Sequence, residues 1–218
     1  MQQIGMIIFR DEHWNTINLD TFLKMKLSNA NNYITSLLMN GKLIVGRKTF
    51  ESFSLELQQS PLYRFSIISR NEKISDPIEY FGTDKEGKQI KKTKEHVRRL
   101  KGSSTIFVFP TITSALLYLT KQEINEESCE EESISSYDHS SIYFLGGPMV
   151  YKEATDLHMC TFIDDVKINT SLTQGSTFRK IQVEGWDGSD KQIFEKDENS
   201  GYSARVKHWK KYPDKKTV

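Results

Sequence analysis

The chain contains little cysteine, shows no metal-ligand spacing and carries almost no net charge, and each absence excludes a class of protein. Two cysteines in 218 residues, Cys129 and Cys160, are too few for a disulfide scaffold and are typical of a reducing compartment. Neither lies at metal-ligand spacing and the histidines do not cluster with them, so we predict no bound metal. A formal net charge of +1 gives no overall attraction to nucleic acid or to a membrane surface.

Long apolar runs are also missing. No run approaches the roughly 20 residues of a membrane-spanning helix, and the first residues lack the basic start and cleavage site of a secretory signal. Hydrophobic residues nevertheless make up 37% of the chain, which is enough for a packed core. We therefore expect a soluble cytoplasmic protein with one domain over residues 1–218 and a small-molecule substrate. Neither nucleic acid nor membrane is expected as a partner, and the oligomeric state is left open.

The stretch Ile142–Tyr151, IYFLGGPMVY, is the most informative part of the sequence. Its four apolar residues fit a strand covered on both faces, as in a parallel sheet. Gly146 and Gly147 follow at once, and then comes an amphipathic segment that reaches Leu157 and opens with Pro148, where a helix tolerates proline. Such a turn lets a phosphate or a flat ring approach the backbone. The alternative is a tight turn that binds nothing.

Two further strands end in polar residues that suit a phosphate. Lys42–Val45 leads into Gly46–Thr49, where two cations and a hydroxyl open a helix. Phe65–Ser69 ends in a hydroxyl followed by Arg70. The carboxyl edge of an open α/β sheet is where ligands bind, so these turns predict a shared anion site. The alternative for Gly46–Thr49 is a solvated helix start.

The remaining pattern alternates strands with helices and closes with a hairpin. The expected elements are strands at Ile4–Phe9, Thr105–Phe109 and Asp165–Thr170, helices from Ser28 and over Thr111–Thr120, and a hairpin of Lys191–Lys196 with Tyr202–Trp209. This order predicts an α/β fold with a mostly parallel central sheet, an antiparallel C-terminal hairpin and flanking helices.

Two polar stretches interrupt this pattern and are predicted to be insertions. Residues 71–104 are rich in charge, with a short strand expected at Pro77–Phe81. Their lysines and arginines favour a solvated face over a nucleic-acid patch, because few aromatic residues interleave with them. Residues 122–136 are acidic and rich in serine, which favours a mobile loop.

Taken in order, these pieces resemble the dihydrofolate reductase family. The resemblance rests on five stretches: LIVGRKTFES (Leu43–Ser52), SIISR (Ser66–Arg70), TIFVFPTITSALLYL (Thr105–Leu119), IYFLGGPMVYKEA (Ile142–Ala154) and EGW (Glu184–Trp186) before the hairpin. It covers most of the chain. It implies the dihydrofolate reductase fold, NADPH as cofactor, and reduction of dihydrofolate to tetrahydrofolate by hydride transfer to the pterin ring.

The resemblance also assigns roles to individual residues. The pyrophosphate and 2′-phosphate side of NADPH is assigned to Gly46, Arg47, Lys48 and Thr49, and the 2′-phosphate to Ser69 and Arg70. The nicotinamide and diphosphate are assigned to Gly146, Gly147, Met149, Val150 and Tyr151. The pterin pocket is assigned to Met6, Ile7, Tyr33, Ile34 and Phe53, with Arg64 pairing with the glutamate carboxylate of folate.

The chain departs from the family at the acid that holds the pterin. Without gaps, that position is Ala30, and an alanine cannot bind the ring N–H and amino groups. Asp20 and Asp164 are candidate replacements, so the catalytic acid stays unassigned. The family's hydroxyl on a later strand falls on Asn169, Thr161 or Asp164, according to the gaps chosen.

Three interpretations follow from this mixture of kept and lost features. The first is a dihydrofolate reductase whose acid comes from elsewhere, the second is an NADPH-dependent reductase of another pterin or of a pyrimidine, and the third is an inactive binding or assembly protein on the same fold. The kept glycines and phosphate-binding residues favour an enzyme, because a scaffold has little physical need for them.

Overall fold

The computed structural model describes residues 3–39, 41–60, 62–70, 80–83, 89–92, 97–99, 105–126, 141–170, 176–177, 186–196 and 201–211. An eleven-stranded sheet runs through the molecule, with the strand order β12-β13-β10-β1-β9-β3-β4-β8-β7. The six central strands are parallel to one another: β10 (Phe162–Ile168), β1 (Ile4–Arg10), β9 (Ile142–Phe144), β3 (Lys42–Gly46), β4 (Arg64–Ile68) and β8 (Thr105–Phe109).

Antiparallel strands complete both ends of this sheet. At one end β12 (Trp186–Phe194) and β13 (Ala204–Lys211) form the C-terminal hairpin, and β13 pairs with β10. At the other end β7 (Val97–Arg99) pairs with β8. A side branch joins β2 (Asn15–Ile17) to β1 and to β11 (Ser176–Thr177), and β5 (Tyr80–Thr83) pairs separately with β6 (Gln89–Lys92). The predicted fold class is confirmed.

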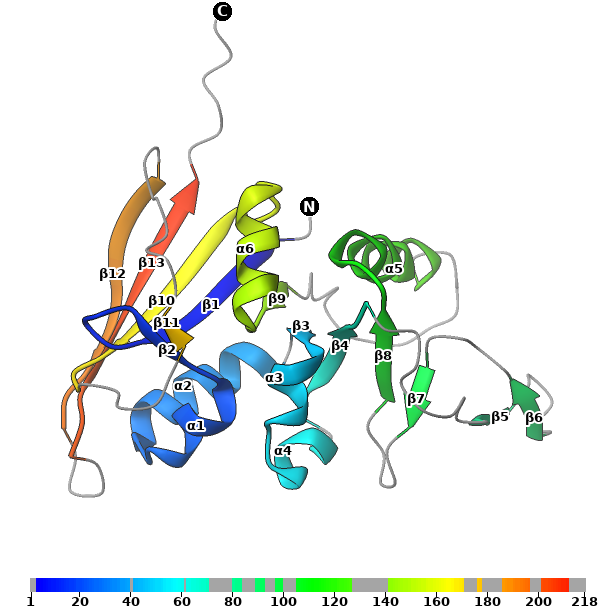
Figure 1. Ribbon diagram of the computed structural model, residues 1–218, viewed down its shortest axis with the longest axis horizontal. Helices are drawn as coiled ribbons and strands as arrows, with labels where there is room; N and C mark the ends of the chain where they lie inside the picture. The colour runs from blue at the N-terminus through cyan, green and yellow to red at the C-terminus, as the bar shows by residue number, and fades with distance from the viewer. Residues whose placement is uncertain are drawn as a thin grey trace, which may run out of the picture.

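Helices cover the two faces of the sheet in separate layers (Figure 1). One layer contains α1 (Leu19–Lys24), α2 (Ser28–Met39), α3 (Arg47–Glu51) and α4 (Leu55–Gln59), and the other contains α5 (Ile112–Glu126) and α6 (Pro148–Asp156). Side chains alternate along a strand, so β1 feeds both cores: Ile7 and Phe9 face α1 and α2, whereas Met6 and Ile8 face α5 and α6. Full burial on both faces explains why β1 and β9 are continuously apolar in sequence.

Several elements differ from the expected pattern. The expected polar connection after β1 contains β2, and the segment before Ser28 contains α1, whose N-cap is Asn18. Helix α5 runs to Glu126, so the predicted loop over 122–136 begins as helix. Most of the predicted insertions lie outside the described residues, although β5 overlaps the short strand expected at Pro77–Phe81. Among the described residues no helix is long and apolar enough to cross a membrane.

Candidate functional site

A cavity of about 490 Å³ opens at the carboxyl ends of β3 and β9. Its lining comes from three places in the chain: β2 with the start of α1, helix α3, and the turn between β9 and α6. The lining residues are Thr16, Ile17, Asn18, Thr21, Lys48, Thr49, Ser52, Leu145, Gly146, Gly147, Pro148 and Tyr151. One wall is β2 with the start of α1 and the other is α3; both carry hydroxyl groups, and the first also carries the Asn18 amide, alongside apolar surface, which suits a ligand with polar and apolar parts.

Two glycine turns meet at the floor of this cavity. The Gly46 N–H donates to the Gly146 carbonyl at 3.0 Å, which ties the end of β3 to the turn after β9. Gly146 and Gly147 have φ values of +122° and +84°, a region that side-chain-bearing residues rarely adopt. A β-carbon on Gly147 would lie 3.0 Å from Thr49 Oγ1 and 3.7 Å from Gly46 Cα. The glycine at position 147 is therefore what lets the two turns pack this closely together.

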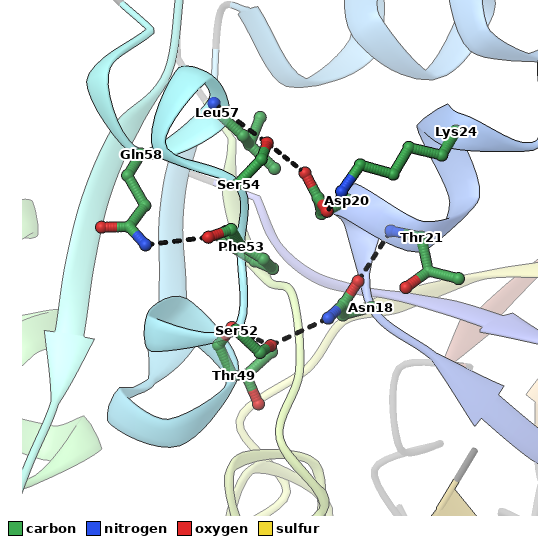
Figure 2. A network of polar contacts seen from close by, with 10 residues as sticks. All are labelled: Asn18, Asp20, Thr21, Lys24, Thr49, Ser52, Phe53, Ser54, Leu57 and Gln58. Carbon is green, nitrogen blue, oxygen red and sulfur yellow. Dashed lines mark hydrogen bonds and ion pairs between the residues drawn. The ribbon is translucent and has the colours of Figure 1, made fainter. Parts of the chain in front are cut away.

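A hydrogen bond joins the two walls (Figure 2). Asn18 Nδ2 donates to Ser52 Oγ at 2.9 Å, while Asn18 Oδ1 accepts the Thr21 N–H and caps α1. Ser52 Oγ in turn donates to the Thr49 carbonyl at 2.6 Å. One asparagine therefore couples the start of α1 to the end of α3.

Asp20 lies beside this bridge but does not line the cavity. Its carboxylate accepts from Ser54 Oγ and from Lys24 Nζ, each at 2.5 Å (Figure 2). Burial raises the pKa of Asp20, but the hydrogen bonds from Lys24 and Ser54 outweigh burial, so the pKa lies below its ordinary value. Asp20 is therefore an ionised carboxylate that fastens α1 to the link between α3 and α4.

Tyr151 connects the cavity to β1. Its hydroxyl donates to the Ile7 carbonyl at 2.6 Å from a fully buried position. Burial raises the pKa of this phenol well above its ordinary value, so it stays a neutral donor. Tyr151 thus fixes the cavity floor against the central strand.

The predicted phosphate-binding arginines flank the cavity and do not line it. Arg47 Nη1 pairs with Glu51 at 3.0 Å on α3. Arg70 follows β4 and lies 3.7 Å from Glu153 of α6. The register places the end of β4 beside Gly46, so both arginines stand at the same sheet edge as the glycine turns.

Ser69 and the residues of α6 occupy different positions at this edge. The Ser69 N–H donates to the Phe109 carbonyl at 2.9 Å, which joins β4 to β8. Val150 is buried near Gly46, whereas the Met149 side chain is 58% exposed and outside the cavity lining. Of the predicted cofactor residues, the structure brings five around the cavity: Lys48, Thr49, Gly146, Gly147 and Tyr151.

The predicted substrate residues do not line this cavity. Met6, Ile7, Ile34 and Phe53 are buried in the core, and Tyr33 packs against it. Exposed Arg64 opens β4, at the strand end opposite Arg70. Ala30, the position that the sequence resemblance assigns to the family's carboxylate, is also a buried core residue of α2.

Asp164 forms a buried charged cluster away from the cavity lining. It is fully buried on β10, with Oδ1 2.7 Å from His208 Nδ1 and 3.6 Å from Lys191 Nζ. Burial lowers the pKa of Lys191, but the nearby Asp164 and Tyr33 raise it by more in total, so the pKa of Lys191 lies above its ordinary value. Asp164 Oδ2 and Tyr33 Oη are buried without a hydrogen-bond partner in the described part of the chain.

The other two candidates for the family's hydroxyl have backbone partners. Thr161 Oγ1 donates to the Ile4 carbonyl at 3.0 Å, and the Asn169 N–H donates to the Ser203 carbonyl at 2.9 Å. Neither residue lines the cavity.

Sequence reasoning missed the wall residues Thr16, Asn18, Thr21 and Ser52. Ser52 carried a usable signal, because it follows Thr49 by three residues and so shares its helix face. Asn18 also carried one, since it is an N-cap residue type just before an apolar helical segment. His208 and Lys191 were missed because their partner Asp164 is reached only by strand pairing.

Comparison with known proteins gives a structural match without a sequence match. No family model and no curated protein matches the sequence. Among solved structures, the chain is similar to a dihydrofolate reductase from Enterococcus faecalis complexed with NADP(H) and RAB-propyl, with a TM-score of 0.62. The similarity covers 97% of both chains at 15% sequence identity, so it establishes a common fold.

Proposed function

We propose that this chain is an NADPH-dependent reductase that transfers hydride to the pterin ring of dihydrofolate. The observation that carries the proposal is the meeting of two glycine turns on the floor of a cavity whose walls include hydroxyl and amide groups. Glycine at position 147 lets its turn pack against Thr49 Oγ1 and Gly46, so both turns reach the edge where a flat ring or a phosphate would lie. The fold similarity to a dihydrofolate reductase complexed with NADP(H) supports the same assignment.

The donor groups around the cavity fit the anionic parts of NADPH. Lys48 and Thr49 would hold the diphosphate, together with the N-terminus of α6, because all of them present positive charge or donors. Arg47 and Arg70 would hold the 2′-phosphate, for which guanidinium is the best-matched group. NADPH supplies the hydride when bound, and the protein supplies its orientation.

The proposal requires a proton donor for the pterin that differs from the family's. Ala30 offers none, and the described residues that line the cavity include no carboxylate. Asp20 is close to the wall but is held by Lys24 and Ser54, whereas Asp164 is held by His208 and approached by Lys191. This observation favours a second candidate function, the NADPH-dependent reduction of another pterin or of a pyrimidine.

The test is NADPH oxidation by the purified chain, followed by absorbance, with dihydrofolate as acceptor and an alternative pterin or pyrimidine in parallel. Oxidation with dihydrofolate supports the first function, and oxidation with the alternative acceptor alone supports the second. NADPH binding without any oxidation contradicts a reductase and leaves the binding or assembly interpretation. Asp20→Asn and Asp164→Asn identify the acid, since loss of activity at every pH is expected for only one of them.

A further inference from the structure

Each arginine at the sheet edge faces a glutamate. Arg47 pairs with Glu51 one turn along α3, and both side chains are partly exposed. Arg70 pairs with Glu153, which comes from a different part of the chain. A cofactor phosphate entering this edge therefore meets two arginine–glutamate pairs, whose formal charges cancel.

The Arg70–Glu153 pair has unequal freedom. The Arg70 side chain is 71% exposed, whereas the Glu153 side chain is 29% exposed because it is part of α6, which packs on the sheet. Glu153 is therefore the more restricted member of the pair, and Arg70 can turn toward a ligand at small cost, since exposed ion pairs contribute little to stability.

Glu153 also belongs to the helix that begins at the cavity floor. Helix α6 starts at Pro148, directly after Gly147, and Glu153 lies further along it. Arg70 reaches this helix from the end of β4, across the neighbouring strand β3. The helix that begins at the glycine turns thus also carries the carboxylate that pairs with Arg70.

We propose that Glu153 makes the cofactor site accept NADH as well as NADPH. A carboxylate accepts a hydrogen bond from the ribose 2′-hydroxyl of NADH, whereas an arginine accommodates the 2′-phosphate of NADPH. Because Glu153 is the more restricted partner and Arg70 can move, the same sheet edge offers a carboxylate to the 2′-hydroxyl of NADH or an arginine to the 2′-phosphate of NADPH. The negative charge of Glu153 also opposes the 2′-phosphate, which lowers the preference for NADPH. This inference rests on the proposed dinucleotide binding.

The test compares the dissociation constants of NADPH and NADH for the wild-type chain, Glu153→Gln and Asp156→Asn. Asp156 is an exposed acid on the same helix, paired with Lys152, so its amide variant changes net charge equally. The wild-type chain is expected to prefer NADPH by less than about tenfold. Glu153→Gln should widen that preference by about fivefold, the upper value for one exposed ion pair, and Asp156→Asn should leave it unchanged.

The outcomes separate this inference from the proposed function. A wild-type preference for NADPH above about a hundredfold, or an unchanged preference in Glu153→Gln, overturns the inference while dinucleotide binding stands. Binding of neither nucleotide to any variant overturns both. Arg70→Ala should weaken NADPH and spare NADH, and equal loss of the two contradicts the assignment of Arg70 on which the inference depends.

Discussion

Gly147 carries the most specific conformational requirement in the site. Its φ of +84° disfavours an ordinary side chain, and its missing β-carbon lets Thr49 Oγ1 and Gly46 pack close to it. Sequence analysis predicted a glycine turn here from the strand and helix around it. The shared site at the sheet edge was predicted as well, but the direct contact between this turn and the one at Gly46 was not, because that contact depends on β3 and β9 being neighbours in the sheet.

Gly147→Ala tests this requirement. A residue forced into an unfavourable φ costs about 1–3 kcal/mol, so we expect a loss of unfolding free energy of that size, together with weaker NADPH binding. Chemical denaturation and an NADPH fluorescence titration measure the two effects. Gly201→Ala is the matched control, because a β-carbon there meets nothing within 4 Å. A Gly147→Ala variant as stable as Gly201→Ala, with unchanged NADPH affinity, would show that the cavity floor does not require glycine at position 147.

At the scale of elements, α1 is the part of the site that sequence analysis described least well. It has six residues, and three of them are buried against the sheet and its neighbours. A helix this short is not stable alone, so its existence depends on tertiary contacts that periodicity does not record. Asn18 supplies two of those contacts, one to α1 itself and one to Ser52 on α3.

Asn18→Ala should both lower the free energy of unfolding and speed the release of NADPH. Loss of the N-cap costs about 1 kcal/mol, and loss of the bond to Ser52 separates the two walls, so NADPH should dissociate faster. Ser54→Ala is the control, because Ser54 caps α4 and holds Asp20 without lining the cavity. Chemical denaturation and stopped-flow displacement of NADPH measure the effects. Similar destabilisation in both variants with faster release in neither would argue against a wall-bridging role for Asn18.

Asp20 makes the free energy of unfolding depend on pH in a predictable direction. Its folded-state pKa is lowered, so its carboxylate contributes stability that is fully present above its unfolded pKa of about 3.9 and is lost as pH falls through the folded pKa. Asp20→Asn should therefore reduce the free energy of unfolding at neutral pH and flatten its decline in acid. Denaturation midpoints across an acid pH series provide the measurement. Wild-type and variant curves that run parallel down to the lowest pH would show that Asp20 does not contribute in this way.

At the scale of the whole molecule, the central sheet could be predicted and the packing of the core beneath α1 and α2 could not. The parallel strands are continuous apolar runs followed by polar turns, and both features are local in sequence. The filled core around Ala30 and Ile7 depends instead on aromatic rings brought in by distant elements. Phe9 stacks on Phe22 of α1 at 4.5 Å, and the Phe162 ring covers Gly5 on β1.

This packing also explains why the predicted cofactor and substrate residues separate in the structure. The glycine turns and α3 lie at the carboxyl edge, which topology alone brings together. Four of the residues assigned to the pterin, Ile7, Tyr33, Ile34 and Phe53, belong to the core beneath α1 and α2, whereas Met6 belongs to the core on the opposite face and Arg64 is exposed. The roles of these residues stay a prediction. Dinucleotide binding at the sheet edge, in contrast, can be tested without knowing the substrate.

Thermal unfolding with and without NADPH is the most direct test of dinucleotide binding at that edge. NADPH at a hundred times its dissociation constant should stabilise the folded chain by about 2.7 kcal/mol. For a chain of this size that corresponds to a rise of about 5–10 °C in the unfolding midpoint, with a clearly smaller rise in Gly147→Ala at the same concentration. A wild-type midpoint that stays constant at every NADPH concentration would contradict the central claim.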